Sequence, residues 1–595
     1  MENQQNPQTP QPLQQQLQQL PPQTPQLQLT PQPETYFAPP PVRPKKQLPK
    51  RENADGIFAL LTFASAFLLV YLGLFGEMAL GFSVAVFAAY AVLFIVAGVR
   101  KIEPRPLGVV YAACALVFAA CYSLYSNPAL AAAWFCAVVA LTALFILELF
   151  GAMRFGHESY WCMRDVLRAV FVHPLIHIGD SVRFLFQKQA DGRGTVGKVL
   201  IGLGISVPIL AILIPILTSS DEDFARLIHN AFGDIGEIIG AFFLAAVLFF
   251  PLWSLLFGFG YEKQPPKAPD IAACRRVDPL ILSVLLGAVG FLYLTYLLTK
   301  TAYFFAAFKS VVPTDDGFPA DFARQGFFEL CVIAVLNAVI LMPVLALTRR
   351  KQTDTLPPVL RILSAVLCLE TLLLIATALQ KMVLYIQRFS LTSIRVYVSA
   401  FLVFLAVAWL ILLLRLFVKK LPVMPLTALC AAAVLIVLTF GGTDVSIVRF
   451  NANHYTSGKV HQLDFAVFGD EYTISRGAVP ELVRLAKSDN AEVQKQARAA
   501  LARSYARYFD FTAKADEETG SWSPGEALPL YTYNSFASRF WCLDIANCIA
   551  ALEGYKDEYF EWAKQYWVIY DSDRMGATFA YEIPGTEPIY VYSVY

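Results

Sequence analysis

The residues best suited to chemistry in this 595-residue sequence lie in a long apolar segment around Glu370. Thr377, Lys381 and Arg388 follow Glu370 at offsets of 7, 11 and 18 residues. At 3.6 residues per turn, these offsets return to one face of a helix. A carboxyl group on such a face could carry a proton, an ion or a substrate through an apolar region. The alternative is a structural polar contact between helices, with Lys381 and Arg388 reaching the membrane interface.

Two neighbouring apolar segments carry polar side chains that could contact Glu370. Asn337 lies in the middle of one segment, where an interhelical hydrogen bond is its usual role. The other segment has a stripe on one face, formed by Tyr293, Tyr296, Lys300 and Tyr303. This stripe indicates either an aromatic belt at a membrane interface or a vestibule for an anionic or sugar-like ligand. We expect Asn337, or a group from the striped segment, to be the partner of Glu370.

Other candidate ligand sets point to neither a metal nor a catalytic centre. His173 and His177 are four residues apart, but Pro174 separates them and no HExxH pattern is present. A second set fits no known ligand spacing: His454, His461 and Asp464. The sequence also lacks a CxxC pair, a P-loop and a GxSxG motif. We therefore expect no catalytic, cofactor-binding or metal-binding residues, and favour a protein that is not an enzyme.

The elements that must position these residues are long apolar runs within residues 51–440. The chain is 56% hydrophobic and 16% charged, whereas soluble proteins average about 25% charged. A helix needs about 20 apolar residues to cross the hydrocarbon core of a bilayer, and helices satisfy their own backbone hydrogen bonds there. The sequence predicts an all-α polytopic membrane protein with about eleven transmembrane helices. The expected spans are 56–75, 80–98, 107–125, 129–150, 198–217, 236–257, 279–299, 327–347, 359–385, 395–417 and 422–440.

The distribution of basic residues predicts how these helices are oriented. With a cytoplasmic N-terminus, the cytoplasmic segments hold 26 lysines and arginines, and the opposite segments between the spans hold seven. The positive-inside rule favours this orientation. An odd number of spans then places residues 441–595 outside, and a miscount of one span would place them inside. We expect a multi-pass protein of a bacterial plasma membrane.

The segments outside the apolar runs predict a tail, an interfacial loop and a separate domain. Residues 1–50 are rich in Gln and Pro, which is typical of disordered chain. In the loop 151–197, apolar residues recur every three to four positions with Arg between them, which suits helices at the cytoplasmic membrane surface. Residues 441–595 are expected to form a small, mainly helical soluble domain with a strand-like tail. Within it, 477–509 resembles a HEAT-type helical pair, and 538–554 a third helix.

Two short motifs give the chain a family resemblance. The sequence YIQRFSLTSIRVY occupies 385–397, and DVSIVRFNANHY follows the last span. Together they resemble the bacterial polytopic membrane proteins of the domain-of-unknown-function family 4153 and its relative, family 4173. The aromatic-Gly-Leu-Thr-x-x-Arg element of that family is matched by Phe389, Leu391, Thr392, Arg395 and Tyr397, and Ser390 stands where glycine is usual. Its Arg-Tyr-Asn-like element is matched by Arg449, Phe450 and Asn451. The resemblance implies a membrane fold and no particular activity.

Three classes of function fit these features. The helical pair, the long loop and the tail favour a non-enzymatic envelope scaffold or sensor, with a protein partner bound through 441–595 or 1–50. The stripe at Glu370 favours a secondary transporter or an ion- or proton-coupled permease, although no inverted repeat is evident. A lipid-linked glycosyltransferase fits least, because the first outer loop, GEMALG, is too short for a catalytic site. The lipid bilayer is an expected partner and nucleic acid is not, since positive-inside topology already explains the basic residues.

Overall fold

The computed structural model describes most of the chain after residue 47. The described residues are 48–75, 78–187, 235–261, 275–299, 320–350, 355–459, 476–515, 522–529, 541–554, 567–573, 576–581 and 589–592, with isolated residues between 206 and 226 and at 463, 465 and 557. The predicted tail 1–50 and the predicted span 198–217 lie largely outside them.

Ten described helices are long and apolar enough to cross a membrane. They correspond to ten of the predicted spans, within four residues at each end except that α14 begins seven residues earlier than predicted. The helical membrane part of the predicted fold is confirmed. They are α1 (Asn53–Leu68, continued by a π-helical turn over Leu69–Leu74), α2 (Leu80–Val99), α3 (Pro106–Leu124), α4 (Pro128–Leu149), α10 (Ile235–Tyr261), α12 (Pro279–Thr299), α14 (Ala320–Leu347), α15 (Pro358–Phe389), α16 (Ser393–Phe417) and α17 (Val423–Phe440).

Local sequence signals define several of the helix starts. Proline occupies the first turn of α3, α4 and α15, where its missing N–H leaves no intrahelical bond unmade. At α1, the Glu52 N–H donates to Asp55 Oδ2 at 2.7 Å within a capping box. At α4, the side chain of Asn127 accepts a hydrogen bond from the Leu130 N–H at 3.2 Å.

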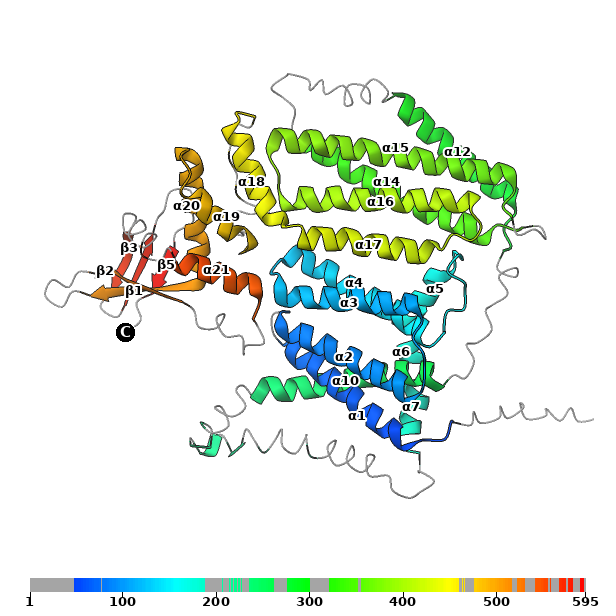
Figure 1. Cartoon of the computed structure of the whole chain (residues 1–595), viewed down its shortest axis with the longest axis horizontal. Helices are drawn as coiled ribbons and strands as arrows, with labels where there is room; N and C mark the ends of the chain where they lie inside the picture. Colours follow the sequence, from blue (N-terminus) through cyan, green and yellow to red (C-terminus); the bar gives the residue numbers. More distant parts are fainter. Residues whose placement is uncertain are drawn as a thin grey trace, which may run out of the picture. The chain divides into compact units, whose positions relative to one another are not determined.

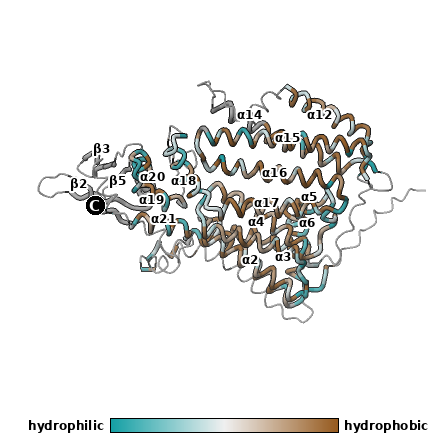
Figure 2. The backbone as a smooth tube through the Cα atoms, turned by 45° about the horizontal axis from the view of Figure 1, so that its top comes forward, coloured by the Kyte–Doolittle hydropathy of each residue, from teal (hydrophilic) through white to brown (hydrophobic). Residues whose placement is uncertain are grey.

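The apolar helices pack as two groups joined by α17. One buried cluster unites α2, α3 and α4 with parts of α10 and α17, and α1 packs against α10. A second buried cluster unites α12, α14, α15 and α16. Figure 1 shows α15, α16 and α17 running side by side, with α17 next to α4. Figure 2 shows that these helices are hydrophobic along most of their length.

The loop after α4 folds into short helices. They are α5 (Cys162–Leu167), a π-helical turn (Arg168–Val172), α6 (His173–Ile176) and α7 (Ile178–Leu185). One face packs on α10, where Trp253 and Phe257 are buried. The other face exposes large apolar side chains: Met163, Leu167, Phe171, Leu175, Ile176 and Phe186. Such a face is suited to the boundary between headgroups and acyl chains.

The C-terminal part of the chain combines helices with two small antiparallel sheets. Its helices are α18 (Thr443–Thr456), a 3-10 turn (Arg476–Ala478), α19 (Val479–Leu485), α20 (Ala491–Tyr508) and α21 (Leu543–Glu553). Strands β1 (Phe509–Ala515) and β2 (Trp522–Pro529) pair with Phe509 opposite Pro529. Strands β3 (Trp567–Asp573), β4 (Gly576–Tyr581) and β5 (Ile589–Tyr592) form the second sheet in that order.

This arrangement extends the expected content of 441–595. Helices occur at both halves of the expected pair, joined by a turn in which Asn490 Oδ1 accepts from the N–H groups of Glu492 and Val493. Strands β4 and β5 lie in the tail with strand-like composition. Strands β1 to β3 were not expected from the sequence.

Candidate functional site

Glu370 lies on α15 in the interior of the second helix group. Glu370 is 8% exposed, and its Oε2 atom has no hydrogen-bond partner among the described residues. The carboxylate faces α12 at Gly290, where an added Cβ would lie 3.5 Å from Oε2. A glycine at this position leaves room for the carboxyl group between the two helices.

A ladder of neutral hydrogen bonds runs beside Glu370 and joins three helices. The Tyr293 hydroxyl on α12 donates to Asn337 Oδ1 on α14 at 2.6 Å. Asn337 Nδ2 donates to Thr371 Oγ1 on α15 at 2.9 Å, and Thr371 donates to the Leu367 carbonyl at 2.7 Å. Asn337 and Thr371 are fully buried. The expected interhelical bond of Asn337 is therefore made with Tyr293 and Thr371, and Glu370 lies next to this ladder.

The remaining members of the predicted stripe lie farther along α15, which is one continuous helix. The Thr377 hydroxyl donates back to the Leu373 carbonyl at 2.8 Å, as isolated Thr residues in helices often do. Lys381 is half-buried and lies about 16 Å from Glu370 along the axis, by the helical rise. The side chain of Arg388 lies outside the described residues. The stripe thus does not bring a described cation to the carboxyl group of Glu370.

The first family motif forms the tight turn between α15 and α16. Ser390 has φ +69° and ψ 179°, a backbone conformation that favours glycine. The guanidinium of Arg395 donates to the carbonyls of Phe389, at 2.6 Å, and Ser390, and stacks over Tyr385 at 4.2 Å. Arg395 therefore closes the turn that Ser390 makes. The positive φ of Ser390 is a physical reason for the glycine that the family motif has at that position.

The second family motif, on α18, forms hydrogen bonds with the backbone of the same turn. Asn451 Nδ2 donates to the Leu391 carbonyl at 2.9 Å, and Asn451 Oδ1 accepts from the Leu391 N–H at 2.8 Å. The amide thus pairs with both polar groups of one residue, and Asn451 is buried. Thr392, next in the chain, is the extended N-cap residue of α16. The two motifs, which lie about 60 residues apart, meet in one contact.

Tyr397 extends this contact to the first helix group. Its hydroxyl accepts a hydrogen bond from Asn127 Nδ2 at 2.6 Å, and the same Asn127 caps α4 through its Oδ1. Sequence reasoning did not single out Asn127. The Asn-Pro pair at the start of an apolar run was its only signal, and that signal indicates a cap rather than a tertiary contact.

A buried carboxylate links α18 to α19. Arg449 donates to both oxygens of Glu481 at 3.2 and 3.1 Å, and Arg484 approaches one of them at 2.6 Å. Burial alone would raise the pKa of Glu481, but the hydrogen bonds and charges of Arg484 and Arg449 outweigh it and lower that pKa. The motif residue Arg449 thus connects the end of the bundle to the helices that follow.

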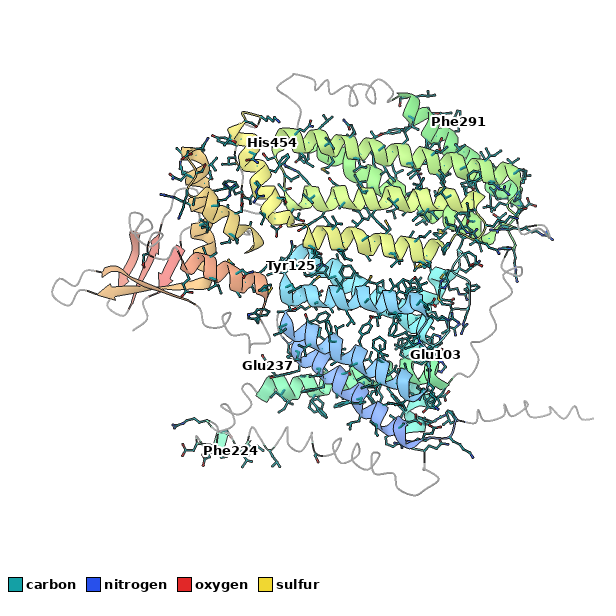
Figure 3. The ribbon with its side chains drawn as sticks, viewed as in Figure 1. Glu103, Tyr125, Phe224, Glu237, Phe291 and His454 are labelled. Atoms are coloured by element: carbon teal, nitrogen blue, oxygen red, sulfur yellow. The ribbon has the colours of Figure 1, made fainter. Side chains whose placement is uncertain are left out.

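Two loops at the same end of the bundle contact α21 or the residues just before it. The Asp544 carboxylate accepts from the Ser126 N–H at 3.3 Å, and the Leu80 N–H donates to the Trp541 carbonyl at 3.1 Å. Figure 3 labels Tyr125, next to Ser126, at this end of α3. We call the set of contacts made by Asn127, the 389–397 turn, Arg449, Asn451, Glu481 and Asp544 the junction.

A second buried glutamate, Glu148, lies at the last turn of α4. Its Oε2 is 3.5 Å from the Arg105 guanidinium, and its Oε1 is 3.1 Å from His157 Nε2. Among the described residues, Oε1 of Glu148 has no hydrogen-bond partner, as is also true of Oε2 of Glu370. His173 and His177, which were weighed as metal ligands, stack on each other at 5.7 Å, and His173 stacks on Phe259 at 4.4 Å.

A family model described as Domain of unknown function (DUF4153) matches residues 112–485. The chain belongs to this family. The DUF4153 match begins within α3 and ends at the last residue of α19, so it includes Glu370, its ladder, both motifs and Glu481. Searches of curated proteins and of solved structures found no match.

Proposed function

We propose that this DUF4153 protein is a non-enzymatic membrane scaffold or sensor, in which the helical bundle is coupled to an extracytoplasmic interaction domain at 441–595. One observation carries the proposal: the described contacts of the family-motif residues form the junction between the bundle and the helices that follow it. Arg395 binds the turn, and Leu391 binds Asn451 on α18. Tyr397 binds Asn127 at the start of α4, and Arg449 binds Glu481 on α19. These side chains hold elements together, and their described polar contacts are with backbone groups and other side chains.

The positions of the arginines support the proposed orientation. Arginines assigned to the cytoplasm bond at one end of the bundle: Arg51 to the Leu185 carbonyl, Arg100 to Asp55 and the Gly260 carbonyl, and Arg415 to the Glu158 carbonyl. The junction lies at the opposite ends of the same helices. The Gly260 carbonyl near the end of α10 accepts from Arg100, so α10 ends on the side that this orientation assigns to the cytoplasm.

A second candidate function, a proton- or ion-coupled permease, is favoured by the buried carboxyl group of Glu370. The two functions differ in which residues they require. A scaffold needs the junction and tolerates Glu370→Gln, because glutamine keeps the shape and polarity of a protonated glutamate. A permease needs the titrating group of Glu370 and tolerates a weakened junction.

Complementation of a strain that lacks the gene separates these functions. Cells carrying Asn451→Ala, Glu481→Gln or Glu370→Gln would be compared for resistance to detergent and osmotic stress, at equal amounts of membrane-inserted protein. The scaffold proposal predicts that Glu370→Gln restores resistance and that both junction variants fail. Full restoration by the junction variants, with failure of Glu370→Gln, would overturn it in favour of the permease.

A further inference from the structure

We propose that Glu370 is a reversible proton-binding site inside the membrane, protonated in the resting protein and held between α12 and α15. The proposal does not rest on the scaffold function. It rests on the burial of the carboxyl group, on the absence of a described cation near it and on the structure of the α12–α15 contact.

An ionised acidic side chain at the centre of a membrane helix costs about 2.5 kcal/mol or more. On α15 itself the nearest described basic residues are Arg361 and Lys381, about 14 and 16 Å away by the helical rise. Neither can pair directly with the carboxylate. With Oε2 unpartnered and Glu370 buried, the neutral acid is the stable form.

The elements packed against Glu370 also offer no compensating charge among their described residues. From α12 the titratable group is the Tyr293 hydroxyl, which already donates to Asn337. From α14 come the neutral Asn337 and, farther along, the thiol of Cys331. The arginines of α16, Arg395 and Arg415, lie near its two ends and bond to backbone carbonyls.

The proton on Glu370 would control the contact between α12 and α15. Of the ten described spans, α12 is the least covered, with 11% of its most apolar window buried. Phe291 on its outer face, labelled in Figure 3, is 73% exposed. The close contact of α12 with α15 includes Gly290 against Glu370 and the Tyr293 ladder. Loss of the proton would place an unpaired charge in this contact, so ionisation requires water or a cation to enter between the helices. Proton release is therefore coupled to opening of the α12–α15 contact.

Infrared spectroscopy of the full-length protein in lipid tests the proposal. The spectrum of Glu370→Gln is subtracted from that of the unaltered protein at about pH 6 and again at about pH 9. These two values bracket the range in which buried glutamates titrate. We expect the carbonyl band of a protonated carboxyl group at the lower pH, and its replacement by carboxylate bands at the higher pH. Glu481→Gln is the control, and its difference spectrum should show a carboxylate at both values, because Arg449 and Arg484 donate hydrogen bonds to Glu481.

Two outcomes would overturn the proposal. A carboxylate signal from Glu370 at about pH 6 would show that the resting group is ionised. A protonated band that persists unchanged beyond about pH 9 would show a permanently neutral acid that does not exchange its proton. Thermal unfolding of Glu370→Gln establishes that the subtraction compares two folded proteins. A hydrophobic carbodiimide, which adds to protonated carboxyl groups, should in addition modify Glu370 and spare Glu481.

Discussion

Ser390 occupies a backbone conformation that is costly for any residue with a Cβ atom. Its φ of +69° with ψ of 179° is tolerated by glycine. For other residues, such a backbone conformation costs about 1–3 kcal/mol of stability. Glycine makes the unfolded chain more flexible, which lowers the free energy of unfolding by about 0.5–1 kcal/mol. The first effect is larger, so Ser390→Gly should stabilise the protein by about 1 kcal/mol.

Thermal unfolding in detergent would measure this effect. Ser390→Ala is the control, since it removes the hydroxyl group and retains the Cβ. It should give no increase in Tm. An equal increase for both variants would mean that the hydroxyl group, and not the backbone conformation, is unfavourable.

The lowered pKa of Glu481 predicts a pH dependence of the junction. A carboxyl group whose pKa is lower in the folded than in the unfolded state stabilises the fold fully above the unfolded value, about 4.3 for glutamate. That contribution is lost as the pH falls through the lower, folded value. The stability difference between the unaltered protein and Glu481→Gln should therefore be large at about pH 7 and shrink below about pH 4. A difference that is constant with pH, measured by thermal unfolding, would contradict the role of the Arg449 and Arg484 contacts.

Among the helices, the ladder through Asn337 ties α12, α14 and α15 together. Asn337→Leu removes both of its hydrogen bonds and leaves the Tyr293 hydroxyl and Thr371 to find new partners. Interhelical hydrogen bonds in membranes contribute about 0.6 kcal/mol on average and up to about 1.7 kcal/mol. We expect a loss of about 1 kcal/mol in unfolding experiments in detergent. Tyr293→Phe, which removes one of the two bonds, should lose less, and a larger loss for Tyr293→Phe would be inconsistent with the ladder.

The existence and length of the helices were accessible from sequence, whereas their side-chain contacts were not. Apolar runs of about 20 residues predict spans because the bilayer fixes their length. The bonds of Asn337 to Tyr293 and Thr371, however, depend on which helices are neighbours and how they are rotated. The shared face of Glu370 and Lys381 follows from helical periodicity alone. The position of Gly290 opposite Glu370 does not, since it requires the packing of α12 on α15.

The same limit applies to the junction. The motif residues Arg395, Arg449 and Asn451 were identified by family resemblance, but the resemblance carries no geometry. The contacts of Arg449 and Asn451 join segments more than 30 residues apart in sequence, and nothing local to Asn451 indicates that it binds the Leu391 backbone. Asp544 and Trp541 lie beyond the family match. Their partners, Ser126 and Leu80, contribute backbone N–H groups. Every residue except proline has such a group, so the side chains of these partners do not indicate the contacts.

At the scale of the whole molecule, the account requires that 441–595 lie outside the cytoplasm. Alkaline phosphatase fused after Thr443 should be active, since this enzyme functions only outside the cytoplasm. A cytoplasmic reporter at the same position should be inactive, and the reverse should hold at residue 190, within the loop that follows α4. The opposite pattern at Thr443 would require an even number of crossings and would place the junction in the cytoplasm.

The central claim is that the junction couples the membrane bundle to the helices that follow it, and hydrogen exchange of the full-length protein tests it most directly. Asn451→Ala removes the paired bonds to Leu391, and exposed Asn453→Ala, two positions away on α18, is the control. The account predicts faster exchange for Asn451→Ala both in the 389–397 turn and in α19 and α21, with no change for Asn453→Ala. Faster exchange confined to the turn, with α19 and α21 unaffected, would contradict it.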